Sequence, residues 1–382
     1  MSATEQVLTN LRLILDDEVR QGSLLIHEGR IAALDTAPSH LASAVDCDGD
    51  YLMPGMVELH TDNMEKYFQP RPKVAWPSRQ AALAHDAQMA ASGITTVFDS
   101  LAIGSVETNS MRARALSGMH DALLDMQQRG LARVDHRLHL RCEVSHPGTL
   151  ATFEAMEASP LLGLVSLMDH APGQRQFVSL EAYHTYYQGK FRLSDAEMAA
   201  FIEQQKANSL RYSGEQRREI AARCRARGLA LASHDDATVE HVAESREYGI
   251  GVAEFPTTLV AAEASHRAGM AVLMGAPNVV RGGSHSGNIA AAELVRRGVL
   301  DVLSSDYYPA SLLDAVFRIA EMAEGYSLPQ AVATATRHPA DAVGLHDRGR
   351  LAAGQRADLI RIRVCDGHPL VQRVWCAGRQ VH

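Results

Sequence analysis

The sequence predicts an α/β fold: a (β/α)8 TIM-like barrel with a small discontinuous β-sandwich domain built from both chain ends. Three observations predict it. Eight short apolar runs alternate with stretches of helical periodicity, the pattern of a closed parallel sheet surrounded by helices. Polar residues suited to metal or proton chemistry follow these runs. Strand-like runs separated by turns occupy both ends of the chain.

The two ends carry the predicted β-sandwich domain. Before residue 53, short apolar runs separated by turns occur at Val7-Leu8, Leu11 to Leu15, Ser23 to Ile26 and Ile31 to Leu34. The pattern returns after residue 345, for example at Val374 to Gly378. We therefore expect residues 1–53 and 345–382 to form one domain and residues 54–344 to form the barrel.

The barrel strands are predicted from the short apolar runs between these ends. They lie near Met56 to Leu59, Thr95 to Phe98, Leu138 to Val144, Leu164 to Met168, Ala230 to Ser233, Gly251 to Phe255, Ala271 to Met274 and Asp301 to Ser304. A long helical insertion, about residues 176–227, separates the fourth strand from the fifth. Its position predicts a lid over the barrel.

The active site of such a barrel lies at the carboxyl ends of its strands. The polar residues that end the eight runs are His60, Asp62, Asp99, Glu143, Asp169, His170, His234, Asp235, Asp236, Glu254, Asn278 and Asp306. Imidazoles and carboxylates gathered at one end of a barrel predict a metal site.

The first strand is the most informative. His60 and Asp62 alternate, so their side chains share one face and converge on one ion. In the third strand, His139, Arg141 and Glu143 share a face, and Glu143 is the candidate to bridge two ions. An internal ion pair between Arg141 and Glu143 is the alternative.

His234 and Asp306 complete the predicted centre. His234 ends the fifth strand and is a candidate ligand, with a structural histidine as the alternative. Asp306 ends the eighth strand, where a carboxylate both binds metal and accepts the proton of the attacking water. The alternative for Asp306 is a cap on the following helix.

Basic residues near the strand ends predict an anionic substrate. Lys66 and Arg71 follow the first strand, and Arg175 follows the fourth. After the seventh strand, Asn278, Arg281 and His285 lie in a glycine-rich segment, 275–288, that resembles a phosphate cradle. We expect these six residues to bind substrate.

Composition limits the partners. The net charge is −8, which gives no reason to expect nucleic acid or a membrane surface as partner. Five scattered cysteines without CxxC spacing argue against disulfides and thiolate zinc sites. With no predicted span and no signal-like N-terminus, we expect a cytoplasmic protein that acts on a small molecule. The oligomeric state stays open, a homo-oligomer included.

Several motifs resemble known families. Pro-Gly-Met-Val-Glu-Leu-His (54–60) and Gly-Arg-Leu-Ala-Ala-Gly-Gln-Arg-Ala-Asp-Leu-Ile (349–360) resemble the amidohydrolase superfamily. Within it, His-Thr-Asp-Asn-Met-Glu-Lys (60–66), Met-Asp-His-Ala-Pro-Gly-Gln-Arg-Gln-Phe (168–177), Ser-His-Asp-Asp (233–236) and Ser-Ser-Asp-Tyr-Tyr-Pro (304–309) look like the PhnM family of the carbon-phosphorus lyase pathway.

The resemblance implies a metal-dependent phosphoric anhydride hydrolase of phosphonate metabolism. It would cleave the α–β bond of a ribose 1-methylphosphonate 5-triphosphate to give the 5-phosphate and pyrophosphate. The superfamily implies one or two divalent ions, with zinc first and manganese, iron or magnesium as alternatives. Two other functions stay open: a deacetylase or cyclic amidase, and a non-catalytic component of a phosphonate-processing complex.

The sequence also departs from the superfamily pattern. Asp62 stands where a second histidine is usual, and Glu254-Phe255-Pro256 replaces the histidine usual after the sixth strand. The expected ligands are therefore His60, Asp62, Glu143, His234 and Asp306, with His170 in reserve.

Overall fold

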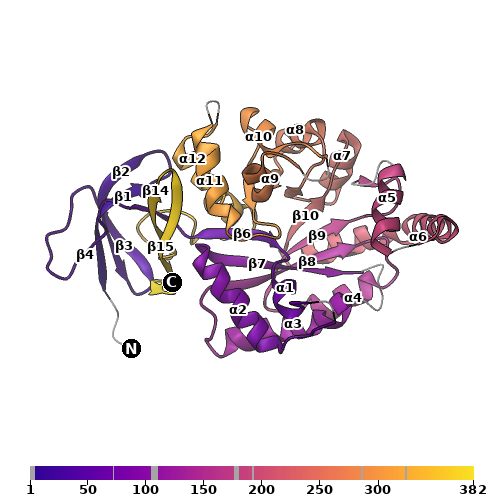
Figure 1. Cartoon of the computed structure of the whole chain (residues 1–382), viewed down its shortest axis with the longest axis horizontal. Helices are drawn as coiled ribbons and strands as arrows, with labels where there is room; N and C mark the ends of the chain where they lie inside the picture. The colour runs from indigo at the N-terminus through magenta and orange to yellow at the C-terminus, as the bar shows by residue number, and fades with distance from the viewer. Residues whose placement is uncertain are drawn as a thin grey trace.

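Eight parallel strands form a nearly closed barrel in the computed structural model, which describes residues 5–71, 73–104, 111–175, 180–191, 193–284, 287–322 and 325–382. The strands follow one another around the sheet in chain order (Figure 1). They are β6 (Met56–Thr61), β7 (Ile94–Ile103), β8 (Asp135–Glu143), β9 (Leu162–Met168), β10 (Ala230–His234), β11 (Val252–Glu254), β12 (Ala271–Gly275) and β13 (Val302–Ser304).

The last strand meets the first through Asp306. Its backbone N–H donates to the carbonyl of His60 at 3.1 Å, and its carbonyl accepts from the N–H of Asp62 at 3.2 Å. Thr61 and Asp306 form a parallel bridge. The seam of the barrel therefore runs between two segments that the sequence predicts to be part of the site.

The predicted fold class is confirmed, and each of the eight expected strands is present. Several strands are longer than expected, β7 most of all. β7 continues to Ile103, so Asp99 lies within the strand rather than at its end. β8 begins at Asp135 and includes His139, Arg141 and Glu143, as expected.

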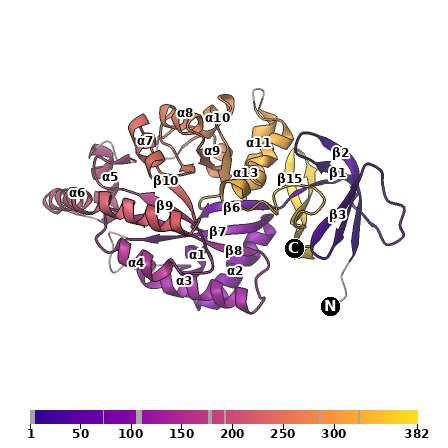
Figure 2. The ribbon, with the colours of Figure 1, turned by 180° about the vertical axis from the view of Figure 1, so that it is seen from behind.

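Helices cover the outside of the barrel (Figures 1 and 2). They are α1 (Met64–Phe68), α2 (Ser78–Ala91), α3 (Met111–Gln128), α4 (Thr149–Met156), α5 (Leu180–Phe191), α6 (Asp195–Ala226), α7 (Val239–Glu247), α8 (Leu259–Arg267), α9 (Ala276–Arg281), α10 (Ala291–Arg296), α11 (Ser311–Glu321), α12 (Leu328–Ala333) and α13 (Arg337–Ala342). No helix among the described residues combines the length and apolarity that a membrane crossing requires.

Local sequence explains where several helices begin. Ser194 and Glu197 form a capping box at the start of α6, and Ser327 and Gln330 form another at α12. α6 lies in the predicted helical insertion. The second half of α6 does not form the predicted lid, because Ile220 and Cys224 are buried in the core that covers β8 and β9.

Strands from both chain ends form a second, mixed sheet. It contains β1 (Gln6–Ile14), β2 (Val19–His27), β3 (Arg30–Asp35), β4 (Val45–Asp46), β5 (Tyr51–Pro54), β14 (Leu359–Cys365), β15 (His368–Cys376) and β16 (Arg379–Gln380). β14 pairs antiparallel with β5, which joins the two ends. The Nε atoms of Arg361 and Arg363 lie 2.6 and 2.8 Å from the carboxylate of Asp50 and strengthen this connection.

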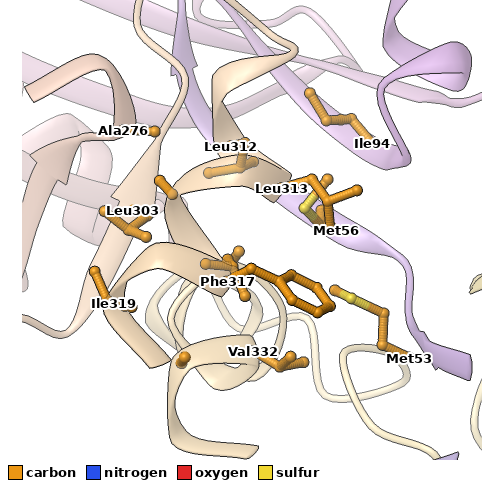
Figure 3. Packing of buried hydrophobic residues seen from close by; sticks show 14 of the residues in the cluster. Met53, Met56, Ile94, Ala276, Leu303, Leu312, Leu313, Phe317, Ile319 and Val332 are labelled. Carbon is orange, nitrogen blue, oxygen red and sulfur yellow. The ribbon is translucent and has the colours of Figure 1, made fainter. Parts of the chain in front are cut away.

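A continuous apolar cluster joins this sheet to the barrel (Figure 3). Met53 of the end sheet and Met56 of β6 pack near Phe317 of α11. The ring of Phe317 also meets Tyr51 edge-on, with ring centroids 6.2 Å apart. The apolar face of α11, which includes Leu312, Leu313, Val316 and Ile319, supplies much of the cluster. The two sheets therefore share this cluster, in addition to the clusters that each has of its own.

Candidate metal centre and substrate site

Two imidazoles and one carboxylate converge at the carboxyl ends of β9 and β10. The Nε2 atoms of His170 and His234 lie 3.6 and 3.4 Å from Oδ2 of Asp235. One ligand atom from each of the three lies within 4.8 Å of the others. Two imidazoles and a carboxylate are a common ligand set for divalent metals.

Carboxylates behind the two imidazoles fix their orientation. Oε2 of Glu143 lies 2.7 Å from Nδ1 of His170, and Oε2 of Glu254 lies 3.3 Å from Nδ1 of His234. A carboxylate on Nδ1 holds the ring and leaves Nε2 available, which is the usual support for a metal-binding histidine. The donor set and its supports therefore fit a divalent metal.

His60 of β6 belongs to the same network. Its Nδ1 lies 3.1 Å from Oε1 of Glu254, and its ring stacks on His234 with centroids 5.7 Å apart. His139 lies behind it, with Nδ1 3.7 Å from Glu254. Burial, reinforced by the nearby Arg141, lowers the pKa of His60 to about 4, so the ring is neutral near pH 7. A neutral imidazole is the form that binds metal.

Strained backbone marks three of these strand ends. Asp235, Phe255 and Asp306 have φ values of 57°, 52° and 55°, in the left-handed region that non-glycine residues rarely adopt. At Phe255 and Asp235 the strain is held by backbone bonds to the neighbouring strands, Phe255 N–H to Leu273 and Asp235 N–H to Glu254, both 2.9 Å. Strain of this kind gathers at functional sites.

Asp306 lies beside two other carboxylates. Partial burial, and then the charges of Asp62 and Asp235, raise the pKa of Asp306 to about 6, against the opposing charges of Arg141 and Lys66. The ammonium group of Lys66 donates to the carbonyl of Tyr307. The helix that follows, α11, has Ala310 at its N-cap, so Asp306 does not cap it. The structure thus brings Asp306 and Asp62 together, as expected from sequence.

Glu143 differs from the predicted bridging ligand. Its Oε1 accepts from Ser145 Oγ at 2.6 Å and from the His170 N–H at 3.1 Å, while Oε2 faces His170 Nδ1. Both oxygens are therefore engaged within the protein. The alternative of an ion pair with Arg141 is not found within the described residues. Glu143 supports His170, which the sequence placed only in reserve.

Arg175 also differs from its predicted role. It is 3% exposed, and its guanidinium contacts Asp236 and donates to Glu244 at 2.9 Å. Arg217 of α6 joins Glu244 at 3.1 Å and Asp169 at 3.2 Å. This buried ion network ties the β9 and β10 loops to α6 and α7. Arg175 is thus already paired, and it is not a free cation for substrate.

The other predicted substrate residues lie in different surroundings. Asn278 lies in α9 and uses its amide to hold the start of α10, donating to the Ile289 carbonyl at 3.2 Å and accepting from the Ala291 N–H at 3.0 Å. Arg71 and Arg281 are exposed. His285 lies outside the described residues. Lys66 is the predicted cation whose charge acts on Asp306.

Two residues of the site were not among the predicted ligands: Asp235 and Glu254. Both stand at predicted strand ends, and that position was the available signal. Their roles depend on which way the side chains turn. Asp235 faces His170 and His234, and Glu254 contacts His60 and His234 with separate oxygens.

A second histidine–aspartate group lies between β7, β8 and α2. Oδ1 and Oδ2 of Asp99 lie 2.6 Å from His85 Nε2 and 2.7 Å from His136 Nδ1. The remaining nitrogens face Asn63 at 3.2 Å and Asp86 at 3.3 Å. Every nitrogen has a partner, so these residues form a satisfied hydrogen-bond network rather than a metal site.

Comparisons with known proteins show which family this chain belongs to. The model of the amidohydrolase family matches residues 77–382. Alpha-D-ribose 1-methylphosphonate 5-triphosphate diphosphatase of Escherichia coli (strain K12) is 53% identical over 376 residues, which cover 98% of this chain and 100% of that protein.

Solved structures support the fold. The 5-methylcytosine deaminase of Klebsiella pneumoniae has a TM-score of 0.66 and 16% identity, covering 99% of this chain and 98% of that one. N-acetyl-D-glucosamine-6-phosphate deacetylase of Mycobacterium smegmatis has a TM-score of 0.64 and 16% identity, covering 99% of each chain. The family model and the full-length relative together show that this chain belongs to the amidohydrolase family.

Proposed function

We propose that this chain hydrolyses α-D-ribose 1-methylphosphonate 5-triphosphate to the 5-phosphate and pyrophosphate. The observation that carries the proposal is the 53% identity to the Escherichia coli diphosphatase over the whole of that protein. The carboxylate-rich strand ends and the cations beside them suit a metal-dependent reaction on a polyphosphate.

We infer that His170, His234 and Asp235 hold one divalent ion, and that His60, Asp62 and Asp306 supply ligands at the same end of the barrel. Zinc is the metal we propose. Elemental analysis of the purified protein measures whether one or two ions bind. When bound, such a metal polarises a phosphoryl oxygen and lowers the pKa of water. Glu143 and Glu254 keep the imidazoles oriented.

In the proposed reaction, water adds to the α-phosphorus, and the bond between this phosphorus and the bridging oxygen breaks. The β- and γ-phosphoryl groups leave together as pyrophosphate. A carboxylate oxygen of Asp306 accepts the proton of the water. Its pKa of about 6 suits a general base near neutral pH. Lys66 lies beside Asp306 and offsets negative charge near the leaving group.

The two other functions are less well supported. The deacetylase shares the fold at 16% identity, and an identity this low does not indicate a shared substrate. A non-catalytic role leaves the convergent imidazoles and the strained strand ends without a purpose.

Phosphorus NMR of the products tests the proposal. Metal-loaded protein is mixed with the ribose triphosphate, and pyrophosphate and the 5-phosphate are expected in equal amounts. N-acetylglucosamine 6-phosphate and hydantoin are the competing substrates. Stepwise orthophosphate release, or faster amide cleavage, would overturn the proposal.

Asp306→Asn tests the proton acceptor in the same assay. We expect turnover to fall by about 1,000-fold, because the amide does not accept the proton of water. Metal content, measured by elemental analysis, is expected to stay near that of the wild type, because His170, His234 and Asp235 still hold the ion. Asp314→Asn on the polar face of α11, where the carboxylate pairs with Arg318 at 3.2 Å, is the control. Near-native turnover of Asp306→Asn would remove Asp306 from this role.

A further inference from the structure

Arg141 points into the lumen of the barrel. It lies on β8 between His139 and Glu143, and alternate residues of a strand share one face. His139 meets the ring of His60, with centroids 5.0 Å apart, and Glu143 contacts His170. Since both neighbours on this face reach the site, the side chain of Arg141 enters it between them.

The residues beside Arg141 leave room for its long side chain. The parallel register pairs it with Ala102 on β7 and Ser166 on β9, both small. The hydroxyl of Ser166 is taken by Nε2 of His139 at 2.9 Å. The guanidinium therefore extends past its neighbours on the sheet toward the strand ends.

Arg141 has no partner in the part of the chain that the structure describes. Its guanidinium makes no hydrogen bond and no ion pair there, and its Nε is buried without an acceptor. By contrast, the buried side chains of Arg217 and Arg348 are paired with Asp169 and Asp135. A buried donor without an acceptor is unfavourable, so an unpaired guanidinium here calls for a ligand.

The carboxylates of the site surround this cation at longer range. Burial is the main influence on the pKa values of His60, Asp235 and Asp306, and the positive charge of Arg141 lowers all three. Yet none of these carboxylates lies within ion-pair distance of it. Among the described residues, the guanidinium thus lies close to the site without forming an ion pair with its carboxylates.

We propose that Arg141 binds the phosphoryl group that is attacked, donating two N–H groups to its oxygens. A planar guanidinium matches the spacing of two phosphoryl oxygens. Its position among His60, Asp235 and Asp306 assigns it to the reacting phosphoryl group, and the exposed Arg71 and Arg281 are candidates for the distal ones. The proposal rests on the proposed function and adds a substrate-binding residue to it.

Three variants test this role with the metal-loaded enzyme and the ribose triphosphate. Arg141→Met is expected to lower kcat by about 100-fold or more, because a donor to the reacting group is lost. Arg141→Lys keeps the charge but loses the paired geometry, and a partial recovery is expected. Arg137→Met is the matched control: Arg137 lies on the same face of β8 and pairs with Asp135 at 3.5 Å.

A thermal melt separates binding from a structural role. Because Arg141 has no described partner, Arg141→Met is expected to melt at or above the wild-type temperature. Activity of Arg141→Met within threefold of wild type would overturn the proposal. The proposal would also be overturned if Arg141→Met melted below the wild-type temperature and Arg137→Met lost activity to the same extent.

Binding of ribose 5-phosphate, whose phosphoryl group corresponds to the α-phosphoryl group that is attacked, is measured by calorimetry and keeps this proposal distinct from the proposed function. Weaker binding to Arg141→Met than to wild type supports the assignment even if the ribose triphosphate is not hydrolysed, in which case only the proposed function fails. Equal binding to both, with wild-type hydrolysis intact, overturns the role of Arg141 and leaves the function standing.

Discussion

Glu254 is the residue on which the orientation of two imidazoles depends. One oxygen faces Nδ1 of His60 and the other faces Nδ1 of His234, and the side chain is fully buried. Burial would raise the pKa of Glu254, but the nearby His139 and His60 outweigh it and hold the pKa well below its usual value. The carboxylate is therefore charged and accepts from both rings.

Glu254→Gln is expected to weaken metal binding by about 10- to 100-fold, because the amide presents one acceptor where two are needed. Competition with a chromogenic chelator measures the affinity. Glu263→Gln on α8, whose carboxylate pairs with Arg267 near the surface at 3.6 Å, is the control. An unchanged affinity in Glu254→Gln would show that the rings are held by packing alone.

At the residue scale, position along a strand was enough to predict which side chains lie at the same end of the barrel. His60, His234 and Asp306 end strands, and the barrel brings their ends together. The contacts that a side chain makes with distant segments could not be predicted in this way. The sequence around Arg175 shows a cation in a loop, but not that Asp236 and Glu244 occupy its guanidinium. Pairing of this kind depends on contacts between distant segments.

At the scale of elements, α2, β7 and β8 are joined by a buried chain of charged groups. His136 lies between Asp99 and Asp86, and both contacts involve ring nitrogens, at 2.7 and 3.3 Å. Burial alone would lower the pKa of His136, but these carboxylates outweigh it and raise the pKa to about 10. The folded protein therefore holds a proton that the unfolded chain releases near pH 6.5.

The raised pKa of His136 makes the stability of the fold depend on pH. A raised pKa stabilises the fold fully below pH 6.5, and the contribution is lost as the pH rises toward 10. Urea unfolding of the wild type is expected to show a falling free energy of unfolding across this range. His136→Gln is expected to cost about 3 kcal/mol at pH 7 and to show a shallower fall. If the free energy of unfolding fell equally with pH in the wild type and in His136→Gln, His136 would not be the group responsible.

Strand existence was predictable because apolar runs of strand length recur along the chain, but strand length was not. β7 extends five residues past the predicted end at Phe98, through polar Asp99 and Ser100, to Ile103. Asp99 lies within this strand because His85 and His136 satisfy it there. Periodicity does not reveal such a partner. The same limit applies to α6, where capping marks the start but packing decides that the second half joins the core.

At the scale of the whole molecule, the end sheet and the barrel share the apolar cluster around Phe317. Residues from the end sheet, including Met53, Ile360 and Val374, are buried in the same cluster as Leu303 of the barrel. The two parts are therefore expected to unfold together rather than one after the other.

Phe317→Ala tests this coupling. The loss of a buried ring is expected to cost about 3 to 5 kcal/mol. In a Trp76→Phe background, the fluorescence of buried Trp375 reports on the end sheet, while far-ultraviolet circular dichroism reports mainly on the helices around the barrel. Coincident urea transitions are expected in the parent and in Phe317→Ala. Separate transitions in the parent would show two independent units.

The whole-molecule architecture was the part most open to prediction from sequence. Alternation of strand and helix patterns specifies the barrel, and the two β-rich ends specify the second sheet. The shared core was not predicted, since it depends on the apolar face of α11 meeting Met53 and Tyr51 across the junction.

The seam between β6 and β13 has a consequence for biosynthesis. Thr61 and Asp306 are 245 residues apart, and the proposed proton acceptor sits on the later side of the join. At about 5 to 20 residues per second, a ribosome needs roughly 10 to 50 s to add Asp306 after His60 has been made. His170, His234 and Asp235 leave the ribosome before Asp306 does. A growing chain therefore holds the inferred metal ligands of β9 and β10 before it holds Asp306, and activity is among the last properties it acquires.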